Sequence, residues 1–534
     1  MRSAVVVISI SLLAAPALAV ENVTISTAAT SGGALSGGVF TPTADDANLN
    51  ISDLKAALTT SDVTVNTGST GSQSGDITLA NKLSWPANAL TLNSFHSVII
   101  DAKLSATGTS ALKLRTPHGG ALIISAPGKI TFANTTQLFR IGTTNYTLVA
   151  DLPTLATDIS GNQHGDFALI NNYDASTGPT YNNAPITVEF IGDFQGLGNT
   201  ISNLTINSSA TGQSDALFSW LGPDGTIENL TLSNVSVHNS STSTMVASLV
   251  VLNDGDLNNV SASGQVSQTL GGPIGGLVEL NRSTMENCFA AVSVSAINSG
   301  NKGGGLVGQN DGTISNCSAS GTVSEPSNVD QIVGGLAAVN EGLITQSFAT
   351  GNVTAGTEGI AGGLVALNLN GNIDQSYATG NATGGDTSVV GGLVGQTYNV
   401  SSGNTISNSY ANGDVTGLSD AQVGGLIGTN SNTTVSFCYS TGSPTATGSF
   451  PYIGGFIGTD NGSGTNADNY WSTTSSGITD PSRGAGSPSN DPGITGLTNT
   501  QFRSGLPAGF SSSIWGETTG VNFGLPYLLA LPPS

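Results

Sequence analysis

A glycine-rich motif recurs through the second half of the chain and limits its possible folds more than any other feature. Weaker copies lie around residues 216 and 248. The Gly-Gly-(Leu/Phe) core of the motif begins at seven positions, 28 to 33 residues apart: Gly275, Gly304, Gly334, Gly362, Gly391, Gly424 and Gly454. A fixed period of this length indicates stacked supersecondary units, none of which can bury its apolar face alone.

Each repeat contains three short strand candidates, which in one copy are 306–307, 313–315 and 321–324. Three strands of about five residues and three turns consume about 29 residues, so we expect one repeat per coil. We expect the glycine pairs to adopt positive φ and to leave no side chain that would collide with the next coil. Side-chain alternation shifts after Ile314, which predicts a bend near Asn316.

Two columns of amide side chains support the stacking of coils. Like amides in register both donate and accept hydrogen bonds, so we expect ladders rather than calcium or ligand sites. The first column contains Asn253, Asn281, Asn310, Asn340, Asn368 and Asn430, with Thr397 and Asp460 as departures. The second contains Asn229, Asn259, Asn287, Asn316 and Asn408, with Gln346 and Gln375 as substitutes.

A third column is aromatic, and its orientation decides its role. If the rings face inward they form a packing ladder, and if they face outward they form a platform for sugar rings. The sequence leaves both orientations open. The column contains Phe289, Phe348, Tyr377, Tyr410, Tyr439 and Tyr470, with Ser318 as an exception.

The three cysteines, Cys288, Cys317 and Cys438, share one repeat position that other copies fill with serine. Cys288 and Cys317 lie in successive repeats, within reach of a disulfide across stacked strands. We favour small buried side chains over a bridge. No Cys-x-x-Cys motif or Cys/His cluster predicts a metal site.

The first 19 residues have the order of a secretory signal peptide. A charged start is followed by an apolar run over 4–15 and by the small residues Ala17-Leu18-Ala19. We therefore assign 1–19 as a signal peptide cleaved after Ala19. The apolar run is shorter than the roughly 20 residues that span a bilayer, so we expect export without membrane insertion.

Charge is sparse and unevenly distributed. Residues 1–140 carry 8 basic and 7 acidic side chains, whereas 141–534 carry 4 basic and 27 acidic ones. A surface this acidic repels nucleic acid and anionic lipid, so neither is an expected partner. Few charges also suit stacked coils, because identical charges on neighbouring strands repel each other.

Composition divides the mature chain into five regions. We expect an N-terminal cap region over 20–75, short evenly spaced strands over 76–214, the repeat array over 215–471, a Pro/Ser/Gly-rich linker over 472–493 and a C-terminal cap segment over 494–534. The last region is rich in large apolar side chains, which are scarce elsewhere.

Two short helices are predicted at the ends of stacked strands, where an open edge needs a cover. One covers 52–58 with Ser52 as its N-cap. The other covers 152–159 with Asp151 as its cap and Pro153 in its first turn. The irregular loop over 176–185 and the interrupted copy over 397–404 depart from the repeat, and we expect such departures to carry binding.

Local catalytic motifs are missing. The chain has no Gly-x-Ser-x-Gly elbow, no phosphate-binding loop and no His-Glu-x-x-His motif, and its four histidines share no spacing. We expect no catalytic residue, no cofactor and no metal. Carboxylates on different coils can still meet in space, as in glycosidases.

The array resembles the GLUG motif, Gly-Gly-Leu-Val-Gly-x-Asn followed by Gly-x-Ile-x-Asn-Ser-Tyr-Ala-x-Gly-x-Val. The copies that begin at Gly304, Gly362 and Gly391 match it closely. The stretches 53–100 and 194–206 look like filamentous-haemagglutinin-type adhesins of Gram-negative bacteria. This resemblance implies a right-handed parallel β-helix on or released from the cell surface. The Asn-Pro-Asn-Gly/Leu motifs of two-partner secretion domains are absent, which leaves the route across the outer membrane open.

We therefore predict an all-β fold, a right-handed parallel β-helix (β-solenoid) with short capping helices. The predicted function is that of a secreted or cell-surface adhesin, associated with the outer membrane, which binds carbohydrate or protein on host or environmental surfaces. One alternative is a polysaccharide-active lyase or hydrolase, which would need Asp and Glu clustered on one wall. A structural spacer is the other.

Overall fold

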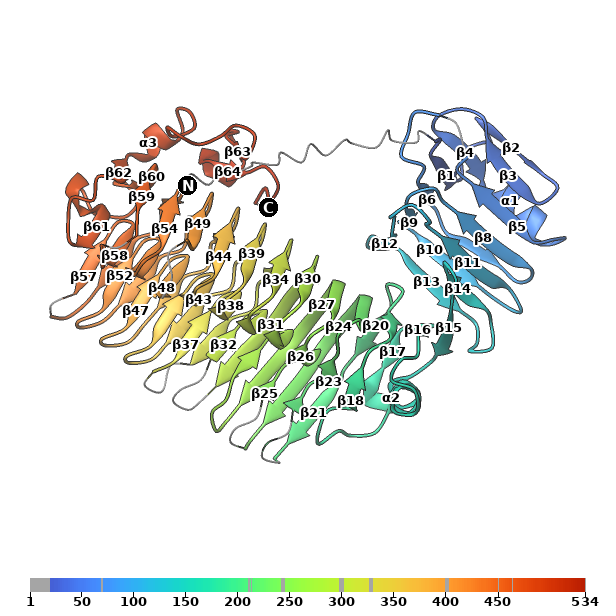
Figure 1. Cartoon of the computed structure of the whole chain (residues 1–534), viewed down its shortest axis with the longest axis horizontal. Helices are drawn as coiled ribbons and strands as arrows, with labels where there is room; N and C mark the ends of the chain where they lie inside the picture. Colours follow the sequence, from blue (N-terminus) through green and yellow to red (C-terminus); the bar gives the residue numbers. More distant parts are fainter. Residues whose placement is uncertain are drawn as a thin grey trace, which may run out of the picture. The chain divides into compact units, whose positions relative to one another are not determined.

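The chain is built almost entirely from short β-strands that pair in parallel with strands about one coil away (Figure 1). It divides into two compact units, Met1–Leu148 and Val149–Ser534. The predicted signal peptide, 1–19, lies outside the described residues. The computed structural model describes residues 20–533 apart from 69–70, 210–211, 213, 242–244, 297–301, 326–329, 399–402, 450 and 463.

The second unit is a solenoid whose coils repeat one order of strands. One coil consists of β32 (Lys302–Gly304), β33 (Val307–Asn310), β34 (Thr313–Ser315), β35 (Ser318–Ala319) and β36 (Val323–Glu325). Each strand pairs in parallel with its counterpart in the next coil. The predicted parallel β-solenoid is therefore confirmed, with one repeat per coil.

Three parallel sheets form the walls of this unit. The first wall has 11 strands, from β18 (Ile186–Phe190) to β61 (Ala485–Ser487), and the second has 9, from β22 (Ser214–Asp215) to β57 (Tyr452–Gly454). The third wall contains β34, β35, β36 and their counterparts. Apolar side chains from all three walls meet in one continuous core, where most are fully buried.

The glycine pairs lie where the second wall passes into the first. A Cβ on Gly304 would lie 1.8 Å from the carbonyl oxygen of Val307, and one on Gly305 would lie 2.1 Å from the carbonyl oxygen of Gly335 in the next coil. Close approach of backbone therefore requires glycine here. The expected positive φ is wrong for this pair, because neither Gly304 nor Gly305 has it.

Left-handed backbone occurs instead in the second amide column, on the third wall. Its members have φ between 45° and 56°, as at Gln346 (45°) and Asn316 (56°). Asparagine tolerates this conformation better than most residues because its short side chain bonds locally. The predicted bend near Asn316 is confirmed, and backbone geometry explains the column as much as stacking does.

The first amide column is a buried ladder, as predicted. Asn281 Nδ2 donates to Asn310 Oδ1 at 2.8 Å, and Asn310 Nδ2 donates to Asn340 Oδ1 at 2.8 Å. Thr397 continues the chain of bonds by donating its hydroxyl to Asn430 Oδ1 at 2.8 Å. Because these side chains are fully buried, they hold coils together and present nothing to a ligand.

The first wall of the second unit ends in a helix on one side and in a further strand on the other. At the start, α2 (Leu152–Gly161) packs on β18, and Asp151 Oδ1 accepts a hydrogen bond from the Thr154 amide at 2.8 Å, as predicted. At the far end, β61 pairs with β58 (Ile457–Asp460). Segment 472–493, predicted to be a linker, therefore contributes a strand to the first wall.

The first unit is a smaller solenoid of the same kind. One coil runs through β6 (Ile77–Leu79), β7 (Leu83–Trp85) and β8 (Ala89–Asn93). Their inward side chains, among them the fully buried Trp85, fill the core. The next two coils repeat this order with β9 (Val98–Ile100), β10 (Lys103–Ala106) and β11 (Ala111–Arg115), then β12 (Leu122–Ile124), β13 (Lys129–Phe132) and β14 (Phe139–Ile141).

Helix α1 (Ile51–Leu58) packs on β7, an edge strand of its sheet. Its N-cap is Asn50, whose side chain accepts from the Ser52 amide at 2.8 Å, so the predicted cap at Ser52 is wrong. Asparagine and serine cap equally well. Ile51 is buried, and the N-cap lies two residues earlier than predicted.

Candidate functional site

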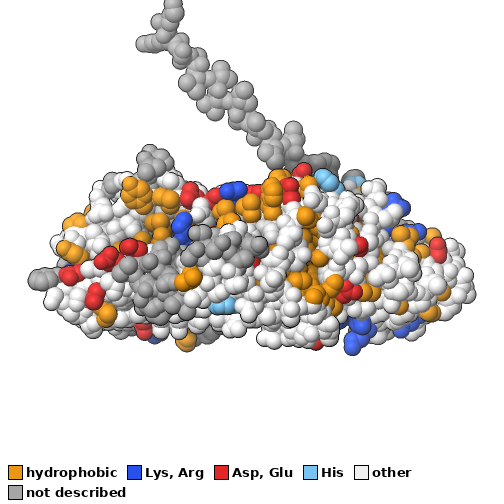
Figure 2. Space-filling view, turned by 90° about the horizontal axis from the view of Figure 1, so that it is seen from below, with side chains coloured by type: hydrophobic (Ala, Val, Ile, Leu, Met, Phe, Trp, Pro, Cys, Tyr) orange, Lys and Arg blue, Asp and Glu red, His pale blue; other side chains and the backbone are white. Residues whose placement is uncertain are grey.

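The described part of the chain contains no group of three or more His, Cys, Asp or Glu side chains that could hold a metal ion. Within the same residues, no helix has the length and apolar character needed to cross a bilayer. The face drawn in Figure 2 is mostly uncharged, with scattered acidic, basic and apolar side chains. Candidate binding sites on this chain therefore include uncharged features of the walls as well as charged ones.

The three cysteines are free and buried. The Cys288 amide donates to Cys317 Sγ at 3.2 Å, and the Cys317 amide donates to Ser347 Oγ at 3.1 Å. Thiol and hydroxyl thus play the same part, accepting an amide from the neighbouring coil. Burial raises the pKa of Cys438 to about 12, so this thiol is a structural group and no nucleophile.

The aromatic column runs along the outer face of the third wall. Phe348, Tyr377, Tyr410 and Tyr439 hold equivalent positions on consecutive coils. Their rings stack face to face, with centroids 4.8 to 4.9 Å apart. The next residue in each strand, such as Ala378, points into the core. The column therefore faces outward, one of the two orientations that the sequence leaves open.

A C-terminal cover, residues 499–533, lies over most of this column, so the tyrosines are buried despite facing outward. Figure 1 shows its elements α3 (Asn499–Phe502), β63 (Trp515–Gly516) and β64 (Tyr527–Leu528) beside the third wall. Tyr439 donates its hydroxyl to the Pro526 carbonyl oxygen at 2.6 Å. The cover's buried apolar contacts come from Phe502, Phe510, Trp515, Leu525 and Leu528.

Where the cover ends, the column opens into a pocket of about 500 Å³, here named the ladder pocket. The rings of Phe348 and Tyr377 line it, and Asn412 and Phe523 contribute an amide and a third ring. On the far side of Phe348 the column position is filled by Ser318, so one face of the Phe348 ring has no aromatic neighbour in the column. The remaining lining residues are Thr350, Thr379, Gly520, Asn522 and Pro533.

Phe523 is the most exposed large apolar side chain among the described residues, at 85%. Its φ of 55° is rare for a bulky residue and stores backbone strain, which tends to mark functional sites. Hydrogen bonds hold this turn in place. Arg503 Nε donates to the Phe523 carbonyl oxygen at 3.0 Å, and Asn412 Nδ2 donates to Asn522 Oδ1 at 2.9 Å. The turn is thus fixed while its ring stays in solvent at the pocket.

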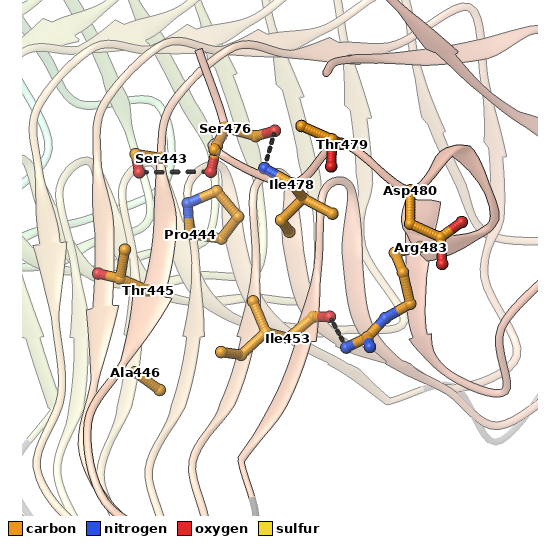
Figure 3. Close-up of a pocket in the computed structure, with 11 residues that line it drawn as sticks. Ser443, Pro444, Thr445, Ala446, Ile453, Ser476, Ile478, Thr479, Asp480 and Arg483 are labelled. Carbon is orange, nitrogen blue, oxygen red and sulfur yellow. Dashed lines mark hydrogen bonds between the residues drawn. The ribbon is translucent and has the colours of Figure 1, made fainter. Parts of the chain in front are cut away.

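A second pocket, of about 470 Å³, lies near the end of the array (Figure 3). Several of its polar groups bond within the chain, although Arg483 Nε is buried without a hydrogen-bond partner among the described residues. Arg483 Nη2 donates to the Ile453 carbonyl oxygen at 2.9 Å, and the Ile478 amide donates to Ser476 Oγ at 3.1 Å. Asp480 accepts from the Ser482 amide at 3.0 Å and caps a short 3-10 helix. This pocket therefore offers little for a ligand.

Carboxyl groups do meet on the third wall, at the outer face of its first coils. Asp193, Glu228 and Asp256 come from three consecutive coils, through strands β19 (Asp193–Gln195), β24 (Thr226–Asn239) and β27 (Asp256–Gln268). Burial raises the pKa of Glu228 above its usual range, against the opposing hydrogen bond that it accepts from Gln195 Nε2 at 2.6 Å. A carboxylic acid near further carboxyl groups is the arrangement that glycosidases require.

The two predicted binding loops have different outcomes. Loop 176–185 is anchored, because Tyr181 packs against the core and its carbonyl oxygen accepts the Asn207 amide at 2.9 Å. The copy over 397–404 lies partly outside the described residues. Sequence reasoning missed the ladder pocket, which forms between segments more than 100 residues apart. The available signal was the concentration of large apolar residues after 494.

Comparison with known proteins identifies the repeat. Residues 299–324 match the family model described as the GLUG motif. Halomucin from Haloquadratum walsbyi is 35% identical to this chain over 133 residues, which is 24% of this chain and 1% of halomucin. This chain therefore spans only a small fraction of that relative's length.

The comparison with solved structures includes a match to a bacterial protein. It is a crystal structure from Bacteroides ovatus, provisionally assigned as an immunoglobulin A1 protease. The alignment covers 72% of this chain and 93% of the other, at 17% identity and a TM-score of 0.32. That score supports no inference about fold or activity. The coils and the matched repeat agree on one conclusion: the chain is a parallel β-solenoid that contains a GLUG motif.

Proposed function

We propose that the protein is an exported attachment protein of the filamentous-haemagglutinin type, without catalytic activity of its own. It acts at the cell surface, associated with the outer membrane, or after release from it, and binds carbohydrate or protein on host or environmental surfaces. The ladder pocket is the observation that carries this proposal. It joins three aromatic rings to hydroxyl and amide groups on a rigid wall.

These groups suit a sugar ring. The apolar C–H face of a pyranose packs on an aromatic ring, and the hydroxyls around its rim pair with the hydroxyls of Thr350 and Thr379. The Asn412 amide is already bonded to Asn522 and Thr441 and shapes the pocket. Stacking with Tyr377 fixes the Phe348 ring, so little conformational entropy is lost on binding. Each pocket binds weakly, and attachment strength comes from many copies of the protein acting together.

The test uses purified 20–534 on a panel of polysaccharides and cell surfaces, scoring retention and release of reducing sugar in the same wells. We expect retention without release. Because each aromatic contact contributes about 0.5–1.5 kcal/mol, Phe348→Ala with Phe523→Ser should weaken retention about tenfold. Tyr452→Ala, which removes a half-exposed ring from the second wall, is the matched control and should retain fully.

Two other outcomes would replace this proposal. A chain that neither retains nor releases sugar would be a spacer. Release of reducing ends would favour the second candidate function, a polysaccharide hydrolase centred on Glu228, whose raised pKa suits a general acid. In that case Glu228→Gln should abolish the release of reducing sugar. Glu286→Gln, two coils further along the same wall, should not.

A further inference from the structure

A groove on the first unit differs from the rest of the molecule in charge. It consists of two adjoining pockets, of about 380 and 450 Å³, that share Asn93 and Pro117. It lies on the outer face of the sheet formed by β3 (Val39–Pro42), β5 (Val63–Asn66), β8, β11 and β14. We name it the basic groove.

Parallel register places its side chains in two columns. One column is Thr64, Thr91, Lys113 and Arg140, and the other is Asn66, Asn93 and Arg115. Asn93 Nδ2 donates to Asn66 Oδ1 at 2.8 Å, which fixes both amides. Lys113 and Arg115 are two residues apart on one strand and therefore project from the same face. Three cations thus gather on one side of the sheet.

These cations have no ionic partner in the described part of the chain. No carboxylate there lies within 4 Å of Lys113, Arg115 or Arg140, and neither pocket is lined by one. Lys113 is moreover in register with Arg140, and like charges directly opposite each other destabilise a sheet. Arg140 Nε donates to the Gly142 carbonyl oxygen at 3.0 Å, which leaves the outer edge of its guanidinium free. In a chain with 34 acidic residues, an acid-free cluster of three cations is complementary to an anion from outside.

The other pocket of the groove supplies a flat apolar surface. Phe95 and His118 stack with ring centroids 3.9 Å apart and an interplanar angle of 13°. Both line the pocket that contains the Asn66 and Asn93 amides. Along the groove, therefore, an aromatic surface, a pair of amides and two guanidinium groups follow one another.

We propose that the basic groove binds an acidic polysaccharide, a chain of sugars that carry carboxylates. Arg115 and Arg140 pair with the carboxylates, since a guanidinium matches a carboxylate with two parallel hydrogen bonds. The Asn66 and Asn93 amides pair with hydroxyls, and one sugar face packs beside Phe95 and His118.

The site's geometry favours this occupant over other polymers. A protein strand would need free backbone groups at a sheet edge, whereas β5, β8 and β11 are each paired on both sides. Nucleic acid carries one charge per about 1.7 Å of duplex, and the three cations of this groove are too few to neutralise so dense a polyanion. A polysaccharide carries fewer charges for its length.

The test is titration of purified 20–534 with polygalacturonate and with its fully methyl-esterified form, which has the same backbone without charge. We expect the ester to bind at least tenfold more weakly, and 300 mM salt to weaken binding of the acid. Arg115→Gln with Arg140→Gln should lower affinity for polygalacturonate at least tenfold. Lys103→Gln with Lys129→Gln, the same loss of charge from another wall of this unit, should leave it unchanged.

Thermal unfolding of each variant shows whether a loss of polygalacturonate binding comes from misfolding. The groove variant should melt close to the wild-type temperature, because removing one charge of the in-register pair offsets the loss of the exposed hydrogen bond from Arg140 to Gly142. Equal binding of acid and ester, no binding of either, or equal loss in the groove and control variants would overturn the proposal. Phe348→Ala should not change polygalacturonate binding, so failure of the ladder pocket and failure of the basic groove are separate results.

Discussion

Glu325 shows how much a single residue can couple this fold to pH. It ends β36, is 1% exposed, and neither of its carboxyl oxygens has a hydrogen-bond partner among the described residues. Its carboxyl group packs against Gly303 of the neighbouring strand, where a Cβ would lie 2.5 Å away. Burial raises the pKa of Glu325 to about 8, so the folded protein holds it as a neutral acid at pH 7.

Stability should therefore fall as pH rises. Below about pH 4.5 the carboxyl is neutral in both states, and between that pH and about 8 only the unfolded chain ionises. The free energy of unfolding should drop by about 1.4 kcal/mol per pH unit in this window. Glu325→Gln should melt at the wild-type temperature at pH 4 and well above it at pH 8.

The exposed Glu341→Gln, which removes the same charge from a turn, should melt like wild type throughout. A wild-type melting temperature that does not change between pH 4 and pH 8 would contradict the neutral state of Glu325. Glu279, whose pKa burial raises to about 7, acts in the same direction over a narrower window, between about pH 4.5 and 7.

The sequence predicts individual residues well where the cause is local repetition. The Asn281–Asn310 ladder and the Asp151 cap follow from spacing and side-chain chemistry alone. The sequence also identifies the Gly304–Gly305 pair, and the expected collision with the next coil is confirmed at Gly305, but the expected positive φ is wrong for both residues. The predicted cap at Ser52 is wrong because burial of Ile51, which places Asn50 at the cap, is not visible in sequence.

At the scale of elements, the aromatic column has one missing member. Ser318 lies between Phe289 and Phe348 in consecutive coils, so two rings that would otherwise stack through a third are separated by a serine. Phe289 is 38% exposed in consequence. The interruption leaves one face of Phe348 free, which the ladder pocket can use.

Ser318→Phe should complete the column. The new ring stacks on both neighbours, and each such pair contributes about 0.5–1.5 kcal/mol, so the free energy of unfolding should rise by roughly 1–3 kcal/mol. Ser320→Phe, on the same coil but outside the column, should give no such gain. Chemical denaturation measures the difference. An unchanged or lower stability for Ser318→Phe would show that the column is not in register here.

At the scale of the whole chain, long-range packing is what the sequence could not supply. Coils follow from a period, because each residue contacts its own counterpart about 30 positions away. The C-terminal cover follows no period, since Tyr439 and Pro526 meet across 87 residues. The basic groove likewise depends on register between β8, β11 and β14. Neither the ladder pocket nor the basic groove could therefore be predicted from the sequence, because both depend on contacts between distant residues.

The C-terminal cover shields the tyrosine column on the outer face of the third wall, and its removal tests that role. Truncation after Leu497 keeps β62 (Ile494–Leu497) paired with its neighbour but uncovers Tyr410 and Tyr439. Each large apolar side chain taken out of its contacts costs about 1.5–3 kcal/mol, and a contiguous apolar patch on a wall promotes association. We expect the truncated chain to melt lower, to bind an apolar dye and to self-associate in sedimentation experiments.

Adding Tyr410→Ser and Tyr439→Ser to the truncated chain should restore the monomer without restoring the melting temperature. Serine is the residue type that the column itself uses at Ser318. A truncated chain that remains monomeric and dye-free would mean that the cover is dispensable and that the tyrosine column tolerates water.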